Sequence, residues 1–324
     1  MSQQKPILLV LGGPPDRWFR QLGSIGEEVE IRLAPRPEEL DSTLPRAEIV
    51  FTWEKSGKWL RERWCQAKKL KWLQSSSAGV ELLLFPELVE SSVVLTNGQG
   101  LYAEPLGEFA LFCVLSFAKD YRTMEDNRRA RRWRNYNAVE ARGQTIGIVG
   151  LGGTGRVVAR MAKAFDMRVI ATKRNAATGA DNGFVDAVVP LEQWHELLGQ
   201  SDFVVNTLPL TPQTVDMFNE AAFRAMKPGA CFINVGRGDT VDEDALLRAL
   251  KEGWIAGAGL DVFKTEPQPP DSKFYDFPNV IVSPHCADLT VGYPEKSARL
   301  LAENIQRYLN SEPLLNVVDK RRGY

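Results

Sequence analysis

Short apolar runs recur along the chain and alternate with longer segments of helical pattern. They are rich in Val, Ile and Leu and lack strict polar alternation, which is typical of strands buried on both faces of a parallel sheet. The runs are ILLVLG (7–12), EIVFTW (48–53), KWLQSSS (71–77), VVLTN (93–97), QTIGIVGLG (144–152), MRVIAT (167–172), FVDAVVP (184–190), DFVVNTLP (202–209), ACFINVG (230–236) and GAGLDVF (257–263). Strands that alternate with helices in this way predict an α/β fold of doubly wound parallel sheets.

Helical patterns fill several of the intervals, most clearly at 101–126, 242–253 and 294–310. The first contains the longest apolar run (106–118), which a Gly-Glu pair interrupts. This run is shorter than the ~18 residues of a membrane span, so we expect a buried helix and no membrane association. The N-terminal stretch MSQQKPILLV lacks the features of a signal peptide, and we expect a cytoplasmic protein.

Composition and charge narrow the functional classes. A length of 324 residues favours two domains, and 44% apolar with 25% charged residues is ordinary for a globular protein. The net charge of −1 creates no general field that would recruit nucleic acid or an anionic membrane. Four scattered cysteines form no CxxC pair, so we expect neither a disulfide framework nor a metal site. They are Cys65, Cys113, Cys231 and Cys286.

One basic run departs from this even charge. The segment NRRARRWRN (127–135) contains Arg128, Arg129, Arg131, Arg132 and Arg134. Because Trp133 and Tyr136 accompany the arginines, nucleic-acid binding is one interpretation. The near-zero overall charge and the lack of a nucleic-acid motif favour instead a solvated or subunit-facing arm.

A glycine-rich turn, Gly150-x-Gly152-x-x-Gly155, follows a strand pattern (145–149) and opens a helical one (155–165). In this context Gly150 permits the tight turn, Gly152 lets backbone N–H groups approach a pyrophosphate, and Gly155 lets the helix pack on the strand. The helix N-terminus adds a partial positive charge towards the phosphates. The pattern therefore predicts a dinucleotide-binding loop in preference to a glycine turn without a ligand.

The end of the next strand lacks the acidic residue that usually binds the ribose 2′-hydroxyl of NAD. Thr172, Lys173 and Arg174 stand there instead, with Lys173 18 residues beyond Gly155. A lysine cannot accept the hydroxyl's hydrogen bond, whereas Lys and Arg can bind the 2′-phosphate of NADP, and Thr172 could add a hydroxyl as a further cofactor contact. We therefore expect NADP(H) to be preferred, with NAD(H) still possible. The competing interpretation is that both cationic side chains point into solvent.

Several motifs in order resemble the D-isomer-specific 2-hydroxyacid dehydrogenases over nearly the whole chain. They are SSSAGVELL, TNGQGLYAEPLGEFAL, VGLGGTG, NTLPLTPQT, MKPGACFINVGRGDTVDEDAL, GAGLDVFKTEP and SPHCADLT. The resemblance implies a Rossmann-type dinucleotide-binding domain (100–289) inserted into a flavodoxin-like substrate domain (1–99 and 290–324). It also implies a homodimer through the cofactor domain, with 106–118 and the arginine-rich arm near the contact.

The same resemblance assigns roles to individual residues. Arg237 would hold the carboxylate and carbonyl of the substrate, His285 would be the catalytic histidine and Glu266 its partner. The backbone amides of Ser77, Ala78, Gly79 and Val80 would bind the substrate carboxylate. The cofactor site would comprise Asp261 near the nicotinamide carboxamide, together with Gly153, Thr154, Pro209, Val235 and Gly236.

The chemistry of these residue types agrees with the roles. An arginine presents a planar fork of donors that suits a carboxylate, and Arg237 directly follows an apolar strand pattern. Imidazole exchanges a proton near neutral pH, and His285 follows another strand end, whereas His195 lies in a helical pattern and is expected to be structural or exposed. Glu266 would orient the ring and favour the imidazolium, but from the sequence it could equally be a solvated loop acid.

Two functions from different classes follow. The leading hypothesis is an oxidoreductase that reduces a 2-keto acid to a D-2-hydroxy acid by hydride transfer from NAD(P)H. The second is a non-enzymatic, dinucleotide-sensing module of the same fold, like the corepressors that resemble these enzymes. Asp288 departs from the family pattern, because a small residue usually follows the histidine at that place. It could bring a second carboxylate near His285, or it could lie on the hinge. Trp53, Tyr102 and Trp133 are candidates for lining the substrate pocket, although aromatic residues are more often core.

Overall fold

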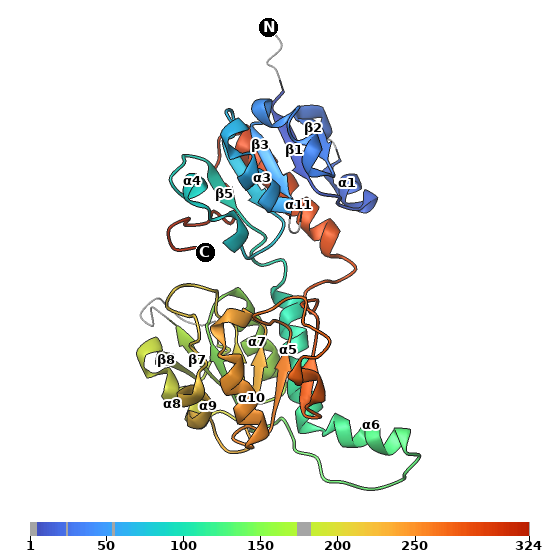
Figure 1. Ribbon diagram of the computed structural model, residues 1–324. Coiled ribbons are helices and arrows are strands. Elements are labelled where there is room, and N and C mark those ends of the chain that lie inside the picture. Colours follow the sequence, from blue (N-terminus) through green and yellow to red (C-terminus); the bar gives the residue numbers. More distant parts are fainter. Residues whose placement is uncertain (1–4, 24, 54–55, 174–182, 324) are drawn as a thin grey trace. The chain divides into compact units, whose positions relative to one another are not determined.

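The chain forms two compact units in the computed structural model, which describes residues 5–23, 25–53, 56–173 and 183–323 (Figure 1). Unit 1 consists of Met1–Tyr102 and Thr290–Tyr324, and unit 2 is Ala103–Leu289. Unit 2 is therefore inserted into the sequence of unit 1. The division falls at 102/103, where the sequence predicted 99/100, and at 289/290.

Unit 1 is built on a parallel sheet of strand order β2-β1-β3-β4-β5, the flavodoxin-like order. The strands are β1 (Ile7–Leu11), β2 (Glu30–Ala34), β3 (Ile49–Thr52), β4 (Trp72–Ser75) and β5 (Val94–Thr96). The helices are α1 (Asp16–Leu22), α2 (Ile25–Glu28), α3 (Gly57–Glu62), α4 (Pro86–Val89) and α11 (Tyr293–Leu309). Successive residues of β3 bury opposite faces, since Val50 joins one core cluster while Phe51 contacts Trp18 of α1.

Strand β2 is the one strand of this sheet that the apolar pattern did not predict. Its sequence is EIRLA, and Leu33 is 51% exposed. It pairs only with β1 and so lies at the sheet edge, where only part of a strand is buried. An edge strand of this kind lacks the continuous apolar run by which the central strands were recognised.

Unit 2 is built on a second parallel sheet, of order β12-β11-β10-β9-β6-β7-β8, which is the Rossmann order with one further strand. The strands are β6 (Thr145–Val149), β7 (Arg168–Lys173), β8 (Ala187–Pro190), β9 (Phe203–Asn206), β10 (Cys231–Asn234), β11 (Gly257–Leu260) and β12 (Val280–Val282). The helices are α5 (Ala103–Ala118), α6 (Tyr121–Arg129), α7 (Gly153–Ala164), α8 (Trp194–Gln200), α9 (Glu220–Ala225) and α10 (Glu243–Lys251). Two core clusters cover its two faces, one with α5 and α7, the other with α8, α9 and α10.

The predicted helical stretch 101–126 is two helices. Asp120 separates α5 from α6 in the left-handed conformation (φ 47°), and its carboxylate accepts the N–H of Thr123 at 3.2 Å as an N-cap. Helix α5 packs closely on α7, because a Cβ on Gly107 would lie 2.6 Å from Val157. No helix within the described residues is long and apolar enough to span a membrane.

Candidate active site

The carboxyl ends of the unit 2 strands carry most of the candidate residues. The glycine loop follows β6, Arg237 follows β10, Asp261 follows β11 and His285 follows β12. In an open parallel sheet ligands bind outside these ends, where the strand order reverses, and here the reversal lies between β6 and β9.

His285 and Glu266 form a direct pair. The Nδ1 atom of His285 lies 2.7 Å from Oε2 of Glu266, and the other oxygen, Oε1, accepts the N–H of Phe263 at 3.0 Å. Glu266 is therefore oriented against the imidazole ring, and is not a loose loop acid. The His285 side chain remains 44% exposed, so it can still be reached from solvent.

A buried carboxylate holds the loop that carries His285. Asp261 is 1% exposed, and its Oδ1 accepts the hydroxyl of Ser283 at 2.6 Å and the N–H groups of Cys286 and Ala287 at 3.0 Å. Its backbone oxygen accepts the N–H of His285 at 2.8 Å. His285 has φ 52°, a conformation that costs energy for a non-glycine residue. The contacts of Asp261 stabilise this loop, a role in addition to the place near the nicotinamide carboxamide that the resemblance implies.

Arg237 stands between two glycines that allow close backbone contact. A Cβ on Gly236 would lie 2.7 Å from the oxygen of Leu208, and a Cβ on Gly238 would lie 2.0 Å from the carbonyl carbon of Phe263. The turns after β9, β10 and β11 thus touch through backbone atoms. Because Glu266 is three residues after Phe263, this contact ties the position of Arg237 to that of the His285–Glu266 pair.

Asp288 interacts electrostatically with both His285 and Arg237. Its pKa is raised above the ordinary value, chiefly by burial and further by the charge of Asp261, while His285 and Arg237 act in the opposite direction. The carboxyl group therefore lies within electrostatic reach of both residues. The structure brings Arg237, His285 and Asp288 into one region of unit 2.

The glycine loop has the geometry that a dinucleotide requires. Gly150 has φ 106°, and a Cβ on Gly155 would lie 2.3 Å from the oxygen of Gly150, so both positions need glycine. A Cβ on Gly152 or Gly153 would meet only open space. Helix α7 begins at Gly153, two residues earlier than predicted, so Thr154 lies in its first turn. Space above the loop and a helix N-terminus aimed at it fit a pyrophosphate.

The end of β7 is only partly as expected. Lys173 is the last residue of the strand and half-buried, while Arg174 lies outside the described residues. Thr172 is fully buried, and its Oγ1 accepts the N–H of Gly150 at 3.1 Å. Its hydroxyl therefore supports the glycine loop, and the contact with the cofactor expected from the sequence stays a prediction.

The predicted carboxylate-binding turn lies in unit 1, directly after β4. The oxygen of Ser77 accepts the N–H of Gly98 at 3.0 Å, and that of Ala78 accepts Nδ2 of Asn97 at 2.7 Å. Residues 77–79 are half-buried and Val80 is buried. Asn97 fixes the turn and was missed as a supporting residue, although it stands inside the motif TNGQGL.

The remaining candidate residues differ in how exposed they are. Pro209 is exposed and its oxygen accepts the hydroxyl of Thr214, while Val235 is buried. His195 is exposed on α8 and lies against Trp194, with ring centroids 4.5 Å apart. The aromatic candidates divide: Trp53 and Tyr102 are buried in unit 1, where both contact Tyr293, and Trp133 is fully exposed. In the described part of the chain, no group of His, Cys, Asp or Glu side chains is arranged to hold a metal ion.

Comparison with known proteins decides the family. The model of the D-isomer specific 2-hydroxyacid dehydrogenase NAD binding domain matches residues 111–287. The chain belongs to the D-isomer-specific 2-hydroxyacid dehydrogenase family. A glyoxylate reductase of Thermococcus gammatolerans is 35% identical over 263 residues, 78% of each chain.

Solved structures of the family match the whole dehydrogenase. An NADPH-dependent glyoxylate/hydroxypyruvate reductase of Sinorhizobium meliloti, in complex with NADP and sulfate, has a TM-score of 0.87 at 29% identity and covers 99% of this chain and 100% of its own. A D-isomer specific 2-hydroxyacid dehydrogenase of Xanthobacter autotrophicus, in complex with NADPH and MES, has a TM-score of 0.82 at 31% identity, with 98% and 99% covered. The present dehydrogenase is thus an NAD(P)-dependent oxidoreductase of 2-keto and 2-hydroxy acids, and the comparisons favour this enzyme over the corepressor-like binding module.

Proposed function

We propose that the dehydrogenase reduces a small 2-keto acid of the glyoxylate or hydroxypyruvate type to the 2-hydroxy acid, D-configured where chiral, and prefers NADPH to NADH. The observation that carries the proposal is the 2.7 Å His285–Glu266 pair in one region with Arg237. The names of the relatives support the substrate class, because they are glyoxylate and hydroxypyruvate reductases.

Each residue has a role that follows from its chemistry. Bound nicotinamide supplies the hydride. The guanidinium of Arg237 binds the carboxylate and polarises the carbonyl oxygen, which increases the positive character of the carbon that is reduced. His285, held at Nδ1 by Glu266, donates a proton from Nε2 to the oxygen as it becomes an alkoxide. We also propose carboxylate binding for the backbone amides of residues 77–80.

The cofactor roles are part of the same proposal. The open glycine loop with Gly153 and Thr154 would bind the pyrophosphate, and Pro209, Val235 and Gly236 would line the dinucleotide. Lys173 and Arg174 would bind a 2′-phosphate through charge-assisted hydrogen bonds. Support comes from Lys173, which ends β7 next to the turn that Thr172 ties to Gly150.

A substrate panel tests the proposal. Glyoxylate, hydroxypyruvate, pyruvate and phenylpyruvate are assayed with NADPH and with NADH under steady-state conditions. We expect the highest kcat/KM with glyoxylate or hydroxypyruvate as the acid and NADPH as the cofactor. A lack of turnover with every acid and both cofactors would overturn the proposal and favour the binding module.

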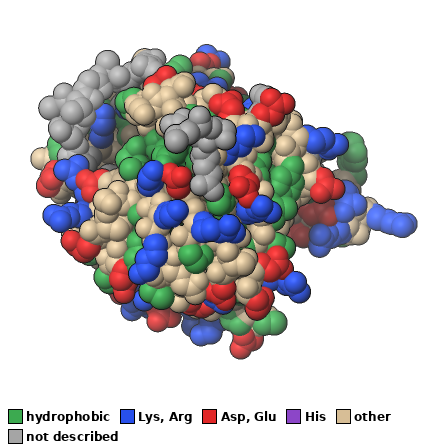
Figure 2. Space-filling model, turned by 90° about the horizontal axis from the view of Figure 1, so that it is seen from above, with side chains coloured by type: hydrophobic (Ala, Val, Ile, Leu, Met, Phe, Trp, Pro, Cys, Tyr) green, Lys and Arg blue, Asp and Glu red, His purple; other side chains and the backbone are tan. Residues whose placement is uncertain are grey.

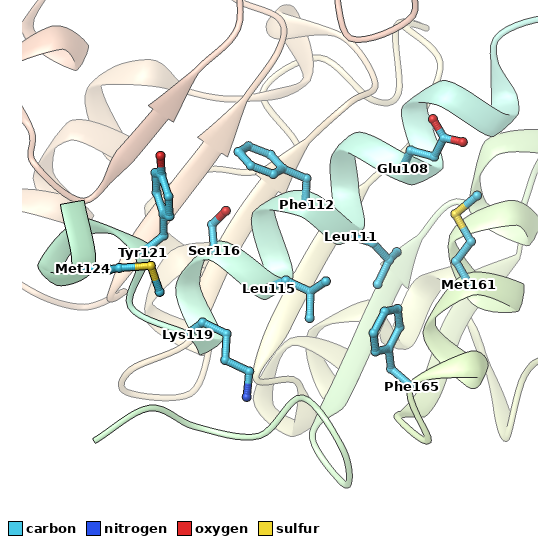
Figure 3. A pocket seen from close by; sticks show the side chains of 10 residues that line it. All are labelled: Glu108, Leu111, Phe112, Leu115, Ser116, Lys119, Tyr121, Met124, Met161 and Phe165. Atoms are coloured by element: carbon cyan, nitrogen blue, oxygen red, sulfur yellow. The ribbon is translucent and has the colours of Figure 1, made fainter. Parts of the chain in front are cut away.

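We further propose that the dehydrogenase is a cytoplasmic homodimer in which a second copy covers α5. A hollow of about 530 Å³ lies along this helix, and Figure 3 shows its lining side chains, which come from α5, α6 and α7 or from the residue directly after α5 or α7. Apolar groups dominate the lining, and Phe112 is 50% exposed. Helix α6 and the segment after it, with the exposed Trp133, project from the body of unit 2 (Figure 1). Such a patch is typical of a protein interface.

The arginine-rich arm fits a protein contact better than nucleic acid. Glu125 accepts hydrogen bonds from Nε of Arg128 at 2.6 Å and from Nε of Arg129 at 2.7 Å, so its single negative charge is shared by two of the arginines and lowers the net positive charge of the arm. Figure 2 shows Lys and Arg side chains interspersed with Asp and Glu over the face that it presents. Nucleic-acid binding would require a continuous basic surface.

A further inference from the structure

A closed ring of buried hydrogen bonds lies directly beneath Arg237. Asn206 and Asn234 are the last residues of the neighbouring strands β9 and β10 and face each other in register. The Nδ2 atom of Asn206 donates to Oδ1 of Asn234 at 3.0 Å and to Oγ1 of Thr240 at 2.7 Å. The backbone oxygen of Arg237 then accepts two hydrogen bonds, from Oγ1 of Thr240 at 2.6 Å and from Nδ2 of Asn234 at 3.2 Å.

The ring also fixes the two neighbouring turns. Oδ1 of Asn206 accepts the N–H of Leu208 at 3.0 Å, and Oδ1 of Asn234 accepts the N–H of Gly236 at 3.0 Å. Each amide thus uses its carbonyl oxygen on the turn that follows its own strand, and both N–H groups of Asn206 are used within the ring. The three side chains are at most 1% exposed, so their polar atoms are shielded from water.

Because the ring is buried, it holds its members in a single geometry. A polar group that loses its partner inside a protein pays the full desolvation cost, so a ring of this kind holds one geometry. The geometry it holds is that of the Arg237 backbone, since three of its hydrogen bonds end on this segment: two on the carbonyl oxygen of Arg237 and one on the N–H of Gly236. Arg237 itself is half-buried and donates from Nη1 to the oxygen of Gly236 at 2.8 Å.

We propose that Asn206, Asn234 and Thr240 are positioning residues that aim the Arg237 guanidinium at the substrate carboxylate. This inference rests on the proposed role of Arg237. A planar guanidinium binds a carboxylate through two parallel bonds only in a narrow range of directions, so a rotation of its backbone weakens both. Asn206 and Asn234 act on the turns of Leu208 and Gly236 as well, whereas the hydroxyl of Thr240 touches only Asn206 and the oxygen of Arg237 among the contacts above.

Thr240 therefore gives the most specific test. Thr240→Val keeps the shape and removes the hydroxyl, and Thr240→Ser restores the hydroxyl in a smaller side chain. The matched control is Ser201→Ala, because Ser201 is also fully buried and its Oγ donates to a backbone oxygen, that of Leu197, at 2.6 Å. The KM and kcat for glyoxylate, the dissociation constant of NADPH and the melting temperature are measured for each variant of the full-length dehydrogenase.

We expect Thr240→Val to raise KM and lower kcat so that kcat/KM falls roughly ten- to a hundredfold, the scale of a misplaced binding group. The dissociation constant of NADPH should change by less than about twofold, and Thr240→Ser should recover most of the loss. Ser201→Ala should lower the melting temperature comparably and leave kcat/KM within about twofold of the unmodified chain. In the Arg237→Ala background, Thr240→Val should add little to the loss, because its effect acts through Arg237.

The outcomes separate this inference from the proposed function. If Arg237→Ala leaves KM and kcat unchanged, the proposed role of Arg237 is wrong. If Arg237→Ala is damaging but Thr240→Val behaves like Ser201→Ala, or if the two losses simply multiply in the double variant, the ring has only a structural role and the positioning inference is overturned.

Discussion

At the scale of single residues, the two histidines make a matched pair for testing acid–base chemistry. His285 touches Glu266 at the end of β12, whereas His195 is exposed on α8. We expect His285→Ala to lower kcat by ~10²–10⁴-fold, the usual contribution of a positioned proton donor. NADPH binding should be nearly unchanged in a fluorescence titration. His195→Ala is the control and should retain full activity. A His285→Ala variant within tenfold of the unmodified enzyme would contradict the assignment.

The raised pKa of Asp288 predicts how the folding stability depends on pH. Burial raises its pKa, so the folded chain holds this proton over a pH range in which the unfolded chain has lost it. Folding stability therefore falls as the pH rises through that range and stays lower above it. Asp288→Asn should unfold at a higher temperature than the unmodified chain at pH 7, and the difference should vanish below about pH 4, where the unfolded carboxyl is protonated.

Asp186 provides a control of opposite sign for that experiment. Its pKa is lowered, first by the hydrogen bond from the N–H of Val169 and then by Lys163, so its ionised form stabilises the fold at neutral pH. Asp186→Asn should lower the melting temperature at pH 7 and lose this effect in acid. If Asp288→Asn behaved in the same way as Asp186→Asn, the pKa of Asp288 would not be raised in the folded chain.

At the scale of elements, we expect the end of β7 to set the preference between NADPH and NADH. An acid at position 173 would repel a 2′-phosphate, which carries nearly two negative charges near pH 7, and would accept a bond from a 2′-hydroxyl. Lys173 and Arg174 would reverse that preference. We expect kcat/KM to favour NADPH over NADH by roughly ten- to a thousandfold, or 1.4–4 kcal/mol, and the ratio to shrink as salt screens the charges.

A double variant tests which charges are responsible. Steady-state kinetics with both cofactors are compared for the unmodified enzyme and for Lys173→Asp with Arg174→Ala. The variant should lose its preference for NADPH, because it lacks both cations and gains an acceptor for the hydroxyl. Equal efficiency of the unmodified enzyme with both cofactors, or an unchanged preference in the variant, would show that the two charges do not recognise the phosphate.

At the scale of the whole molecule, the apolar face of α5 predicts the oligomeric state. Static light scattering at micromolar concentration should give twice the 36.2 kDa mass of the chain. Phe112→Arg should reduce the mass towards that of one chain, because a desolvated charge at an interface core costs several kcal/mol. Leu33→Arg is the matched control, since Leu33 is equally exposed but lies at the edge of the unit 1 sheet. A monomer mass for the unmodified chain would refute the dimer.

The central strands and the family were determined by sequence alone. Strands buried on both faces require continuous apolar runs, and these runs are visible without any knowledge of partners, so both parallel sheets could be predicted. Edge strand β2, half in water, carries no such run and was missed. The end of β7 at Lys173 followed from the same reasoning and is confirmed, because the apolar pattern stops where the strand leaves the core.

For the candidate site, the residue types could be predicted from the sequence, whereas their contacts could not. Arg237, Glu266, His285 and the glycine loop stand inside motifs, so their residue types could be read directly. The hydrogen bonds that orient them could not. Thr172 turns inward to Gly150, 22 residues away, and Asn206 meets Thr240 across 34 residues. Which polar side chains become partners depends on the register of neighbouring strands and on which backbone groups burial deprives of water. Strand register and the burial of backbone groups arise only when the sheet has formed. For this reason only the tertiary structure decided how the candidate catalytic groups are held.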